Sequence, residues 1–196
     1  VSALLGARLL YVVVEYKYFW AYPLEIFKFW KGGLVFYGGL ILGVLVSLWY
    51  LNRHHMPVWK TADLLVPSIA IGQAIGRWGC LFAGCCYGKE TDAIFGITFT
   101  NPRSLAPLET SLHPTQIYLS INALFIFIFL MILSKKKVFD GQVLWSYGIL
   151  YSIGRFLIEY FRGDDRGFPL EQLLSTSQFV GIFIFLLSSF MLLVLY

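Results

Sequence analysis

Residues 71–88 read Ile-Gly-Gln-Ala-Ile-Gly-Arg-Trp-Gly-Cys-Leu-Phe-Ala-Gly-Cys-Cys-Tyr-Gly and include the end of an apolar run that begins near residue 63. A run of about 20 apolar residues is long enough to cross a bilayer as a helix. Arg77 interrupts this run, and a charge at the centre of a spanning helix costs roughly 2.5–3.5 kcal/mol. We therefore expect Arg77 to meet a partner or a ligand, which the neighbouring glycines would allow to approach the backbone.

The composition is that of an integral membrane protein. Hydrophobic residues make up 58% of the 196 residues and charged residues only 13%, whereas about a quarter of a soluble protein is charged. Apolar runs recur at about 1–14, 33–51, 63–83, 115–133, 142–161 and 178–196. We predict an all-α, polytopic membrane helix bundle of about six transmembrane helices, in a single domain over residues 1–196. The first run is short for a span, which we interpret as a shortened N-terminus.

Two segments are predicted to lie outside the hydrocarbon. Residues 84–114 contain three prolines and no long apolar run, and lipid does not tolerate irregular backbone that is left unshielded. We expect them to form a small periplasmic cap. Residues 16–30 are rich in aromatic side chains, which is typical of an interfacial belt or a short helix on the outer leaflet.

Basic residues in short loops predict the orientation. Arg53 and Lys60 lie in one connection and residues 135–137 are three lysines in another, so both connections are expected on the cytoplasmic side. The C-terminus is then cytoplasmic as well. The opposite side receives the segments 15–31, 84–114 and 162–177.

Charge and cysteine content argue against two classes of function. The net charge of +4 is spread along the chain with one basic run, so we expect no nucleic-acid partner. The pattern Cys80-x4-Cys85-Cys86 lacks the second ligand pair typical of a zinc site, so we expect no metal. The cysteines could be nucleophiles if Arg77 stabilised their thiolates, but packing as small apolar residues is the favoured interpretation.

Ionisable residues inside the apolar runs are the candidate site. They are Arg8, Arg77, Arg155 and Glu159. Arg155 and Glu159 are four residues apart on one helix face, which suits an ion pair. Arginines converging near the outer end of a bundle would bind an anionic headgroup such as that of phosphatidylglycerol. The alternative is that Arg8 extends to the interface and that Arg155 and Glu159 form a purely structural pair.

Few residues could carry a proton. His113 precedes Pro114 at the expected start of a helix, which fixes its position, and Tyr37, Glu159 and the cysteines are the other candidates. Next to Tyr37, Gly38 and Gly39 could serve either a ligand or close helix packing.

Several blocks of the sequence resemble the prolipoprotein diacylglyceryl transferases, which are bacterial inner-membrane enzymes. The blocks are similar to the family in the same order along the chain. They are Gly6-Ala-Arg8-Leu-Leu-Tyr11, residues 27–40 with Tyr37-Gly38-Gly39, Gly76-Arg77-Trp78-Gly79, His113-Pro114-Thr115-Gln116-Ile-Tyr118, Tyr151-x3-Arg155-Phe156-x2-Glu159-Tyr160-Phe161-Arg162, and Ser175-x2-Gln178.

This resemblance implies a multi-pass protein of the bacterial cytoplasmic membrane whose active site faces the outer leaflet or periplasm. It implies transfer of the diacylglyceryl group from phosphatidylglycerol to the lipobox cysteine of a preprolipoprotein signal peptide, without a cofactor. Arg77 and Arg155 would hold the phosphate, Glu159 would orient Arg155, and Tyr37 or His113 would assist thiol deprotonation. Residues expected to line the substrate site are Arg8, Tyr11, Gly38, Gly39, Gly76, Gly79, Gly84, Gly88 and Tyr151.

The chain departs from the family pattern at four positions. Cys80, Ala83 and Cys85 stand where the family typically has two asparagines and a glutamate, and Tyr37 stands where well-studied members have histidine. Two alternatives follow from these departures. One is a non-catalytic lipid-binding paralogue, and the other is a related lipid transferase that uses a different donor or acceptor.

Overall fold

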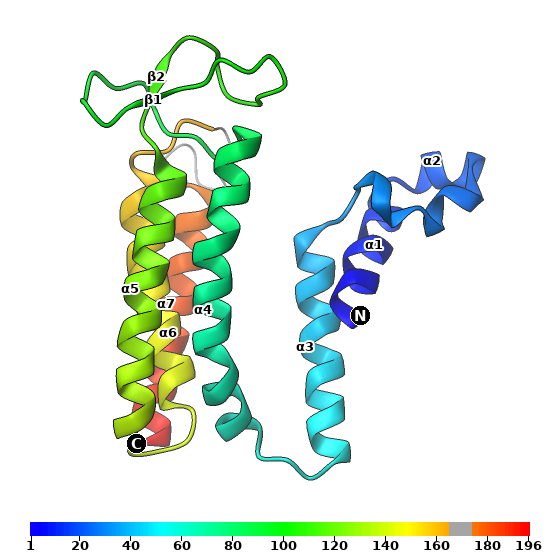
Figure 1. Cartoon of the computed structure of the whole chain (residues 1–196). Coiled ribbons are helices and arrows are strands. Elements are labelled where there is room, and N and C mark those ends of the chain that lie inside the picture. Colours follow the sequence, from blue (N-terminus) through cyan, green and yellow to red (C-terminus); the bar gives the residue numbers. More distant parts are fainter. Residues whose placement is uncertain (165–173) are drawn as a thin grey trace. The chain divides into compact units, whose positions relative to one another are not determined.

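The computed structural model describes residues 1–164 and 174–196, apart from the side chains of residues 31 and 36. The described part is mostly helical (Figure 1). Its α-helices are α1 (Ser2–Val14), α2 (Tyr16–Ala21), α3 (Phe36–Arg53), α4 (Val58–Ala83), α5 (Thr115–Lys136), α6 (Gln142–Glu159) and α7 (Thr176–Leu195).

Each apolar run predicted from the sequence forms one of these helices. Among the described residues, α4, α5 and α7 are long and apolar enough to cross a membrane, and α1 is a shorter apolar helix. The mostly helical membrane fold is thus confirmed with three candidate spans among the described residues, and the number of about six stays a prediction. Most of the expected exterior segment 162–177 lies outside the described residues.

The chain divides into two compact units, residues 1–58 and 59–196, and each is described by itself. In the first unit, α1 packs along α3 at a crossing made of small residues. A methyl group added to Gly38 would collide with the carbonyl oxygen of Gly6, and one added to Gly6 would collide with that of Gly38. Helix packing, one of the two roles predicted for Gly38 and Gly39, is therefore observed, because only glycine lets the backbones approach this closely.

The segment between α1 and α3 folds into short helical pieces. α2 is followed by the 3-10 helices η1 (Pro23–Phe27) and η2 (Phe29–Lys31). The expected short helix is present as α2, and the placement of residues 16–30 at the interface stays a prediction. Many of its aromatic side chains are exposed, among them Trp20 and Trp30.

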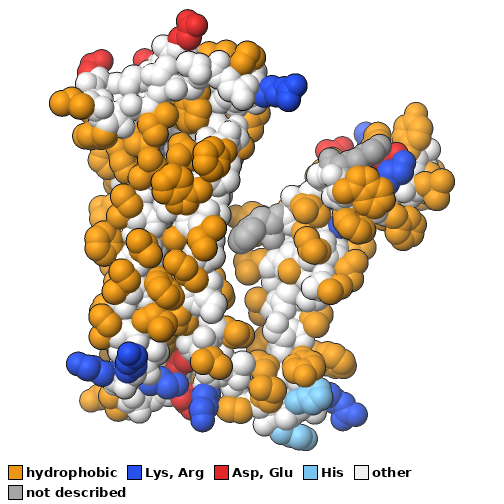
Figure 2. Space-filling model, in the orientation of Figure 1, with side chains coloured by type: hydrophobic (Ala, Val, Ile, Leu, Met, Phe, Trp, Pro, Cys, Tyr) orange, Lys and Arg blue, Asp and Glu red, His pale blue; other side chains and the backbone are white. Residues whose placement is uncertain are grey.

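The second unit is a bundle of α4, α5, α6 and α7 (Figure 1). Its core contains Val66 and Ala70 of α4, Ile126 and Leu130 of α5, and Val143 of α6. Hydrophobic side chains also cover the outside of the bundle, and charged side chains gather at its ends (Figure 2). An apolar outer surface is what a bundle in lipid requires.

A buried carboxylate fixes one end of this bundle. Asp63 accepts hydrogen bonds from the backbone N–H groups of Gly141 and Leu144, at 2.8 and 2.9 Å, where α6 begins. It also forms an ion pair with Lys137 Nζ at 2.9 Å. Asp63 thereby supplies acceptors for the free N–H groups of a helix start.

The opposite end carries the cap. Two short strands, β1 (Ile97–Thr98) and β2 (Ser111–Leu112), pair antiparallel, with Ile97 opposite Leu112. Gly88 lies where the cap crosses the helix ends, and a methyl group there would come within 2.5 Å of the His113 carbonyl oxygen. This crossing brings residues 88–90, the start of α5 and the end of α6 together.

Candidate functional site

Three buried charges meet at the end of α6. Glu159 Oε2 lies 2.9 Å from Arg155 Nη2 and 3.7 Å from Arg162 Nε. The side chains are 7%, 8% and 3% exposed, respectively, so water screens these charges weakly. The ion pair predicted from the spacing of Arg155 and Glu159 is confirmed.

The start of α7 ties into this cluster. Ser175 caps the helix in a capping box with Gln178, and its hydroxyl also donates to Glu159 Oε1 at 2.9 Å. Arg155 Nη2 donates to Ser177 Oγ at 2.9 Å. Two serines of this helix start therefore hold the ion pair in place, Ser175 on Glu159 and Ser177 on Arg155.

Arg162 is a member of the cluster that the sequence-based site did not include. Besides Glu159, it contacts Asp164, with 2.6 Å between Arg162 Nη2 and Asp164 Oδ2. The signal was present in the spacing, because residues three apart share a face at the end of a helix. Arg162 follows the end of α6 and begins the segment 162–177, which was predicted to lie outside the membrane. It was therefore not assigned to the site.

Arg77 lies in α4, near the end that meets the cap, and its side chain is half-buried. No hydrogen bond or ion pair joins it to another residue within 1–164 or 174–196. An arginine without a protein acceptor in an apolar helix offers its fork of N–H donors to an anion. α4 and α6 both end at the cap, so Arg77 and Arg155 lie at the same end of the bundle.

A polar stripe runs along α6 toward Arg155. Tyr147 and Tyr151 stack with ring centroids 5.7 Å apart, two turns and one turn before Arg155, respectively. The Tyr147 hydroxyl donates to Gln73 Oε1 of α4 at 2.8 Å. Tyr151, a predicted substrate residue, therefore lies on the face that α6 directs at the other helices.

His113 stands at the entrance of α5 in an aromatic setting. Its Nδ1 lies 3.1 Å from the Tyr118 hydroxyl, and its ring meets Phe161 edge-on at 5.3 Å between centroids. The backbone around it is held on both sides, since His113 N donates to Lys89 O and Gly88 N donates to His113 O. A histidine so placed can accept or pass a proton without moving its backbone.

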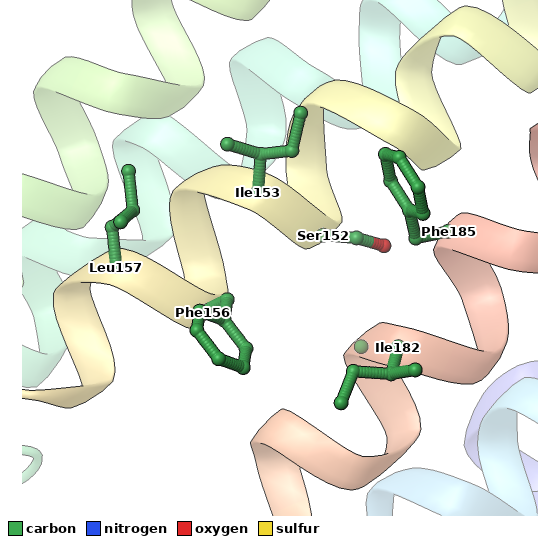
Figure 3. A pocket seen from close by; sticks show the side chains of 7 residues that line it. Ser152, Ile153, Phe156, Leu157, Ile182 and Phe185 are labelled. Atoms are coloured by element: carbon green, nitrogen blue, oxygen red, sulfur yellow. The ribbon is translucent and has the colours of Figure 1, made fainter.

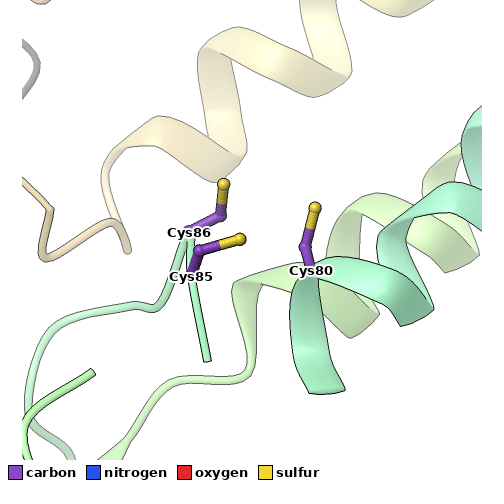
Figure 4. A group of neighbouring side chains, drawn as sticks. All are labelled: Cys80, Cys85 and Cys86. Atoms are coloured by element: carbon purple, nitrogen blue, oxygen red, sulfur yellow. The ribbon is translucent and has the colours of Figure 1, made fainter. Parts of the chain in front are cut away.

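The three cysteines converge where α4 ends (Figure 4). Gly84 has a φ of +66°, its N–H bonds to Leu81 O, and Cys85 N–H bonds to Cys80 O. This is a Schellman motif, which brings the side chains of Cys80 and Cys85 to one side of the helix end. Burial and the neighbouring thiols of Cys86 and Cys80 raise the pKa of Cys85 to about 12.

The four predicted glycines of the second unit fall into two kinds. Beside Gly76 and Gly79 there is open space for an added methyl group, so the α4 backbone is accessible there. Gly84 and Gly88 are instead crowded by Ser104 and by His113, respectively. The first pair leaves room for a ligand, whereas the second pair shapes the cap.

The remaining predicted residues belong to the first unit. Arg8 is buried, and its guanidinium donates to five backbone carbonyls, those of Glu25, Ile26, Lys28, Gly32 and Gly33. These bonds use all five N–H donors of an arginine. In this arrangement Arg8 organises the segment that follows α1 instead of extending to the interface. Tyr11 packs over Gly33, and Tyr37 is 59% exposed in the first turn of α3.

An apolar cavity of about 170 Å³ lies between α6 and α7 (Figure 3). Its walls include Ser152 and Phe156 of α6 and Ile182 and Phe185 of α7. The Ser152 hydroxyl is bonded to the Gly148 carbonyl within its own helix, at 2.7 Å. The cavity therefore suits hydrocarbon and has no place for a charged headgroup.

The sequence model of the prolipoprotein diacylglyceryl transferases matches residues 1–194. The chain belongs to the prolipoprotein diacylglyceryl transferase family. It is 42% identical to the phosphatidylglycerol–prolipoprotein diacylglyceryl transferase of Clostridium tetani over 190 residues, which are 97% of this chain and 75% of the relative. The second enzyme of that name from Clostridium perfringens is 43% identical over 184 residues, 94% of this chain and 71% of the relative.

A third relative, the enzyme of Dehalococcoides mccartyi, is 36% identical over 189 residues, 95% of this chain and 70% of the relative. Membership of the diacylglyceryl transferase family confirms the expected class of transferase. The individual roles of Arg77, Arg155, Glu159, His113 and Tyr37 stay predictions.

Proposed function

We propose that the chain transfers the diacylglyceryl group of phosphatidylglycerol to the thiol of a lipobox cysteine in a preprolipoprotein. The observation that carries this proposal is the match to the family along residues 1–194. In the reaction, the acceptor sulfur forms a bond to the glyceryl carbon, the carbon–oxygen bond to phosphate breaks, and the electron pair leaves with glycerol 1-phosphate.

Arginines would hold the phosphate and offset the charge that the leaving group gains. Arg77 has donors to offer, and Arg155 is oriented by Glu159 and Ser177. Charge-assisted bonds of this kind are strong where water is excluded. The open backbone at Gly76 and Gly79 supports approach of the headgroup to α4.

The acceptor thiol must lose a proton as its sulfur attacks. His113, bonded to Tyr118, or Tyr37 of α3 would take this proton. The apolar cavity between α6 and α7 would receive part of an acyl chain.

The same proposal includes the placement in the membrane. The chain lies in the bacterial cytoplasmic membrane with about six crossings, and residues 1–196 act as one transferase domain. The cap of residues 84–114 and the charged cluster face the periplasm, and the C-terminus is cytoplasmic. The lysines at the end of α5 and the acidic residues of the cap support this orientation.

Complementation tests the function. The chain should restore lipoprotein lipidation in cells depleted of their own transferase, and Arg77→Ala should lower the rate about a hundredfold or more, as loss of one transition-state donor does. Arg103→Ala, which removes an exposed arginine of the cap, is the matched control. Equal labelling by wild type and Arg77→Ala would refute the role of Arg77.

One alternative has a specific observation in its favour. The cysteines at 80 and 85 replace polar residues of the family pattern, which fits a paralogue that binds phosphatidylglycerol without turning it over. Release of glycerol phosphate by purified protein given a lipobox peptide would exclude this alternative. Binding without release would support it.

A further inference from the structure

The proposed function leaves the cysteine cluster without a role. The Sγ atoms of Cys80, Cys85 and Cys86 all lie within 4.8 Å of one another, although Cys80 belongs to a helix and the other two to the turn after it (Figure 4). All three residues are half-buried, so an ion can reach them from solvent.

This spacing is close to that of a thiolate metal site. Zinc binds thiolate at about 2.3 Å, which places two sulfur ligands of a tetrahedron about 3.8 Å apart. Each sulfur–sulfur distance therefore has to shorten by roughly 1 Å at most. Rotation of the cysteine side chains is enough for a change of this size. Three thiolates this close repel one another unless a cation lies between them.

The turn is held in its shape by contacts away from the sulfur atoms. Gln116 Nε2 donates to Cys85 O at 2.8 Å and Thr115 Oγ1 donates to Cys86 O at 2.7 Å. Gln116 and Thr115 are fully buried. Cys86 is kept at a φ of +62°, a conformation that a non-glycine residue adopts only when its surroundings impose it.

A counter-charge lies next to the cluster. The guanidinium of Arg162 interacts with the Cys86 side chain, and its own side chain is almost completely buried. A divalent ion bound by three thiolates has a net charge of about −1, which this arginine would offset. The ligand class favoured by three sulfur donors is a thiophilic cation.

We propose that Cys80, Cys85 and Cys86 form a three-thiolate site for a thiophilic d¹⁰ cation such as Zn²⁺, with a fourth coordination position open. This revises the expectation of no metal that the spacing of the cysteines suggested. Each thiol gives its proton to the buffer and each sulfur gives an electron pair to the ion, so no oxidant or reductant takes part.

The open fourth coordination position would bind the thiol of the acceptor cysteine. This part of the inference rests on the proposed function. Coordination would lower the pKa of the acceptor thiol, so that its proton leaves to the buffer and its sulfur is able to attack the glyceryl carbon. A bound cation would thereby assist the deprotonation of the acceptor thiol.

Metal titration of the full chain in detergent micelles tests the site without using turnover. After treatment with a chelator, the protein should bind one Zn²⁺ per chain against a chromophoric competitor, and Co²⁺ should give thiolate charge-transfer absorption. Cys80→Ser, Cys85→Ser and Cys86→Ser should each weaken binding by at least about tenfold, and the triple variant should abolish it.

His54→Gln with His55→Gln removes two exposed imidazole donors from the loop after α3 and should leave binding unchanged. The proposed metal site would be overturned by absence of Zn²⁺ binding or by equal binding of the triple variant. A disulfide among the three cysteines after purification under reductant would also overturn it. None of these outcomes depends on transferase activity, so they test the metal site separately from the proposed function.

A lipobox peptide tests the fourth position. Its cysteine should strengthen the Co²⁺–thiolate absorption of the loaded protein, and the same peptide with serine should not. If the two peptides behave alike while the metal binds, acceptor coordination is refuted. Glycerol phosphate release by the triple variant at the wild-type rate would refute the catalytic use of the metal, and loss of release in both proteins would instead contradict the proposed function.

Discussion

Glu159 is the single residue that joins the charges at the end of α6. Its two carboxylate oxygens serve Arg155, Arg162 and Ser175, which come from the helix, from the chain after it and from the start of α7. A carboxylate between two buried guanidinium groups keeps them in place at a lower electrostatic cost than either alone.

Glu159→Gln should therefore destabilise the protein, because it removes the charge and keeps the shape. We expect a loss of about 3 kcal/mol in the free energy of unfolding, the range found when one partner of a buried ion pair is removed. Thermal unfolding in detergent measures it. Glu90→Gln, at an exposed position of the cap, should change little, and a similar small effect at Glu159 would contradict the role assigned to it.

Cys85 should be slow to react with iodoacetamide at pH 8. Its thiol has a pKa raised to about 12 by burial and by the other two cysteines, so it is mostly protonated at that pH. In chelator-treated protein we expect alkylation roughly a hundredfold or more slower than that of glutathione. The rate, followed by peptide mass spectrometry, should keep rising from pH 8 to pH 10. A plateau near pH 9 would show an unperturbed thiol.

At the scale of elements, helix ends and crossings decide how the bundle is held together. α6 begins on the carboxylate of Asp63 and α7 begins on a capping box. α1 and α3 meet through glycine backbones. Polar contacts therefore fix the ends of helices in the second unit, and close backbone packing fixes the pair in the first.

Two aspartates share Lys137 and allow a matched comparison. Asp63 is 2% exposed and caps α6, whereas Asp140 is 50% exposed and pairs with the same lysine at 2.7 Å. Asp63→Asn should cost about 2–4 kcal/mol of unfolding free energy. Asp140→Asn should cost under about 1 kcal/mol. Equal losses in denaturant or thermal unfolding would mean that burial does not set the strength of these pairs.

Two glycines of α3 allow a second comparison. An alanine methyl group at position 38 would collide with the Gly6 backbone, whereas at position 43 it would make ordinary contact with Ala3 Cβ at 3.5 Å. Gly38→Ala should destabilise the α1–α3 pair by about 1–3 kcal/mol, and Gly43→Ala should be tolerated. Protease resistance of the first unit distinguishes them, and a tolerated Gly38→Ala would refute the packing role.

At the scale of the whole molecule, charge distribution predicts the direction of insertion. A reporter fused after Lys137 should show cytoplasmic activity, and one inserted near Arg103 in the cap should show periplasmic activity. Changing residues 135–137 to glutamine should weaken this preference, because basic residues in short loops are retained on the cytoplasmic side. A cytoplasmic signal from the cap in the unaltered chain would refute the orientation.

Local features of the sequence were enough for much of the fold. Apolar runs predicted the helices within a few residues, since burial in lipid requires long, continuous hydrophobic segments. The four-residue spacing of Arg155 and Glu159 predicted their ion pair, because one turn of helix brings such residues together. The ordered motifs also identified the family.

Tertiary structure decided what depends on segments that are distant along the chain. It gave Arg8 to five carbonyls of the segment before α3, placed the start of α7 against Arg155 and Glu159, and bonded Gln116 of α5 to the turn of the cysteines. No spacing rule predicts such contacts, because they follow from how helix ends pack. The sequence by itself thus determined helices, local pairs and family, and the packing at the cap determined which polar groups meet there.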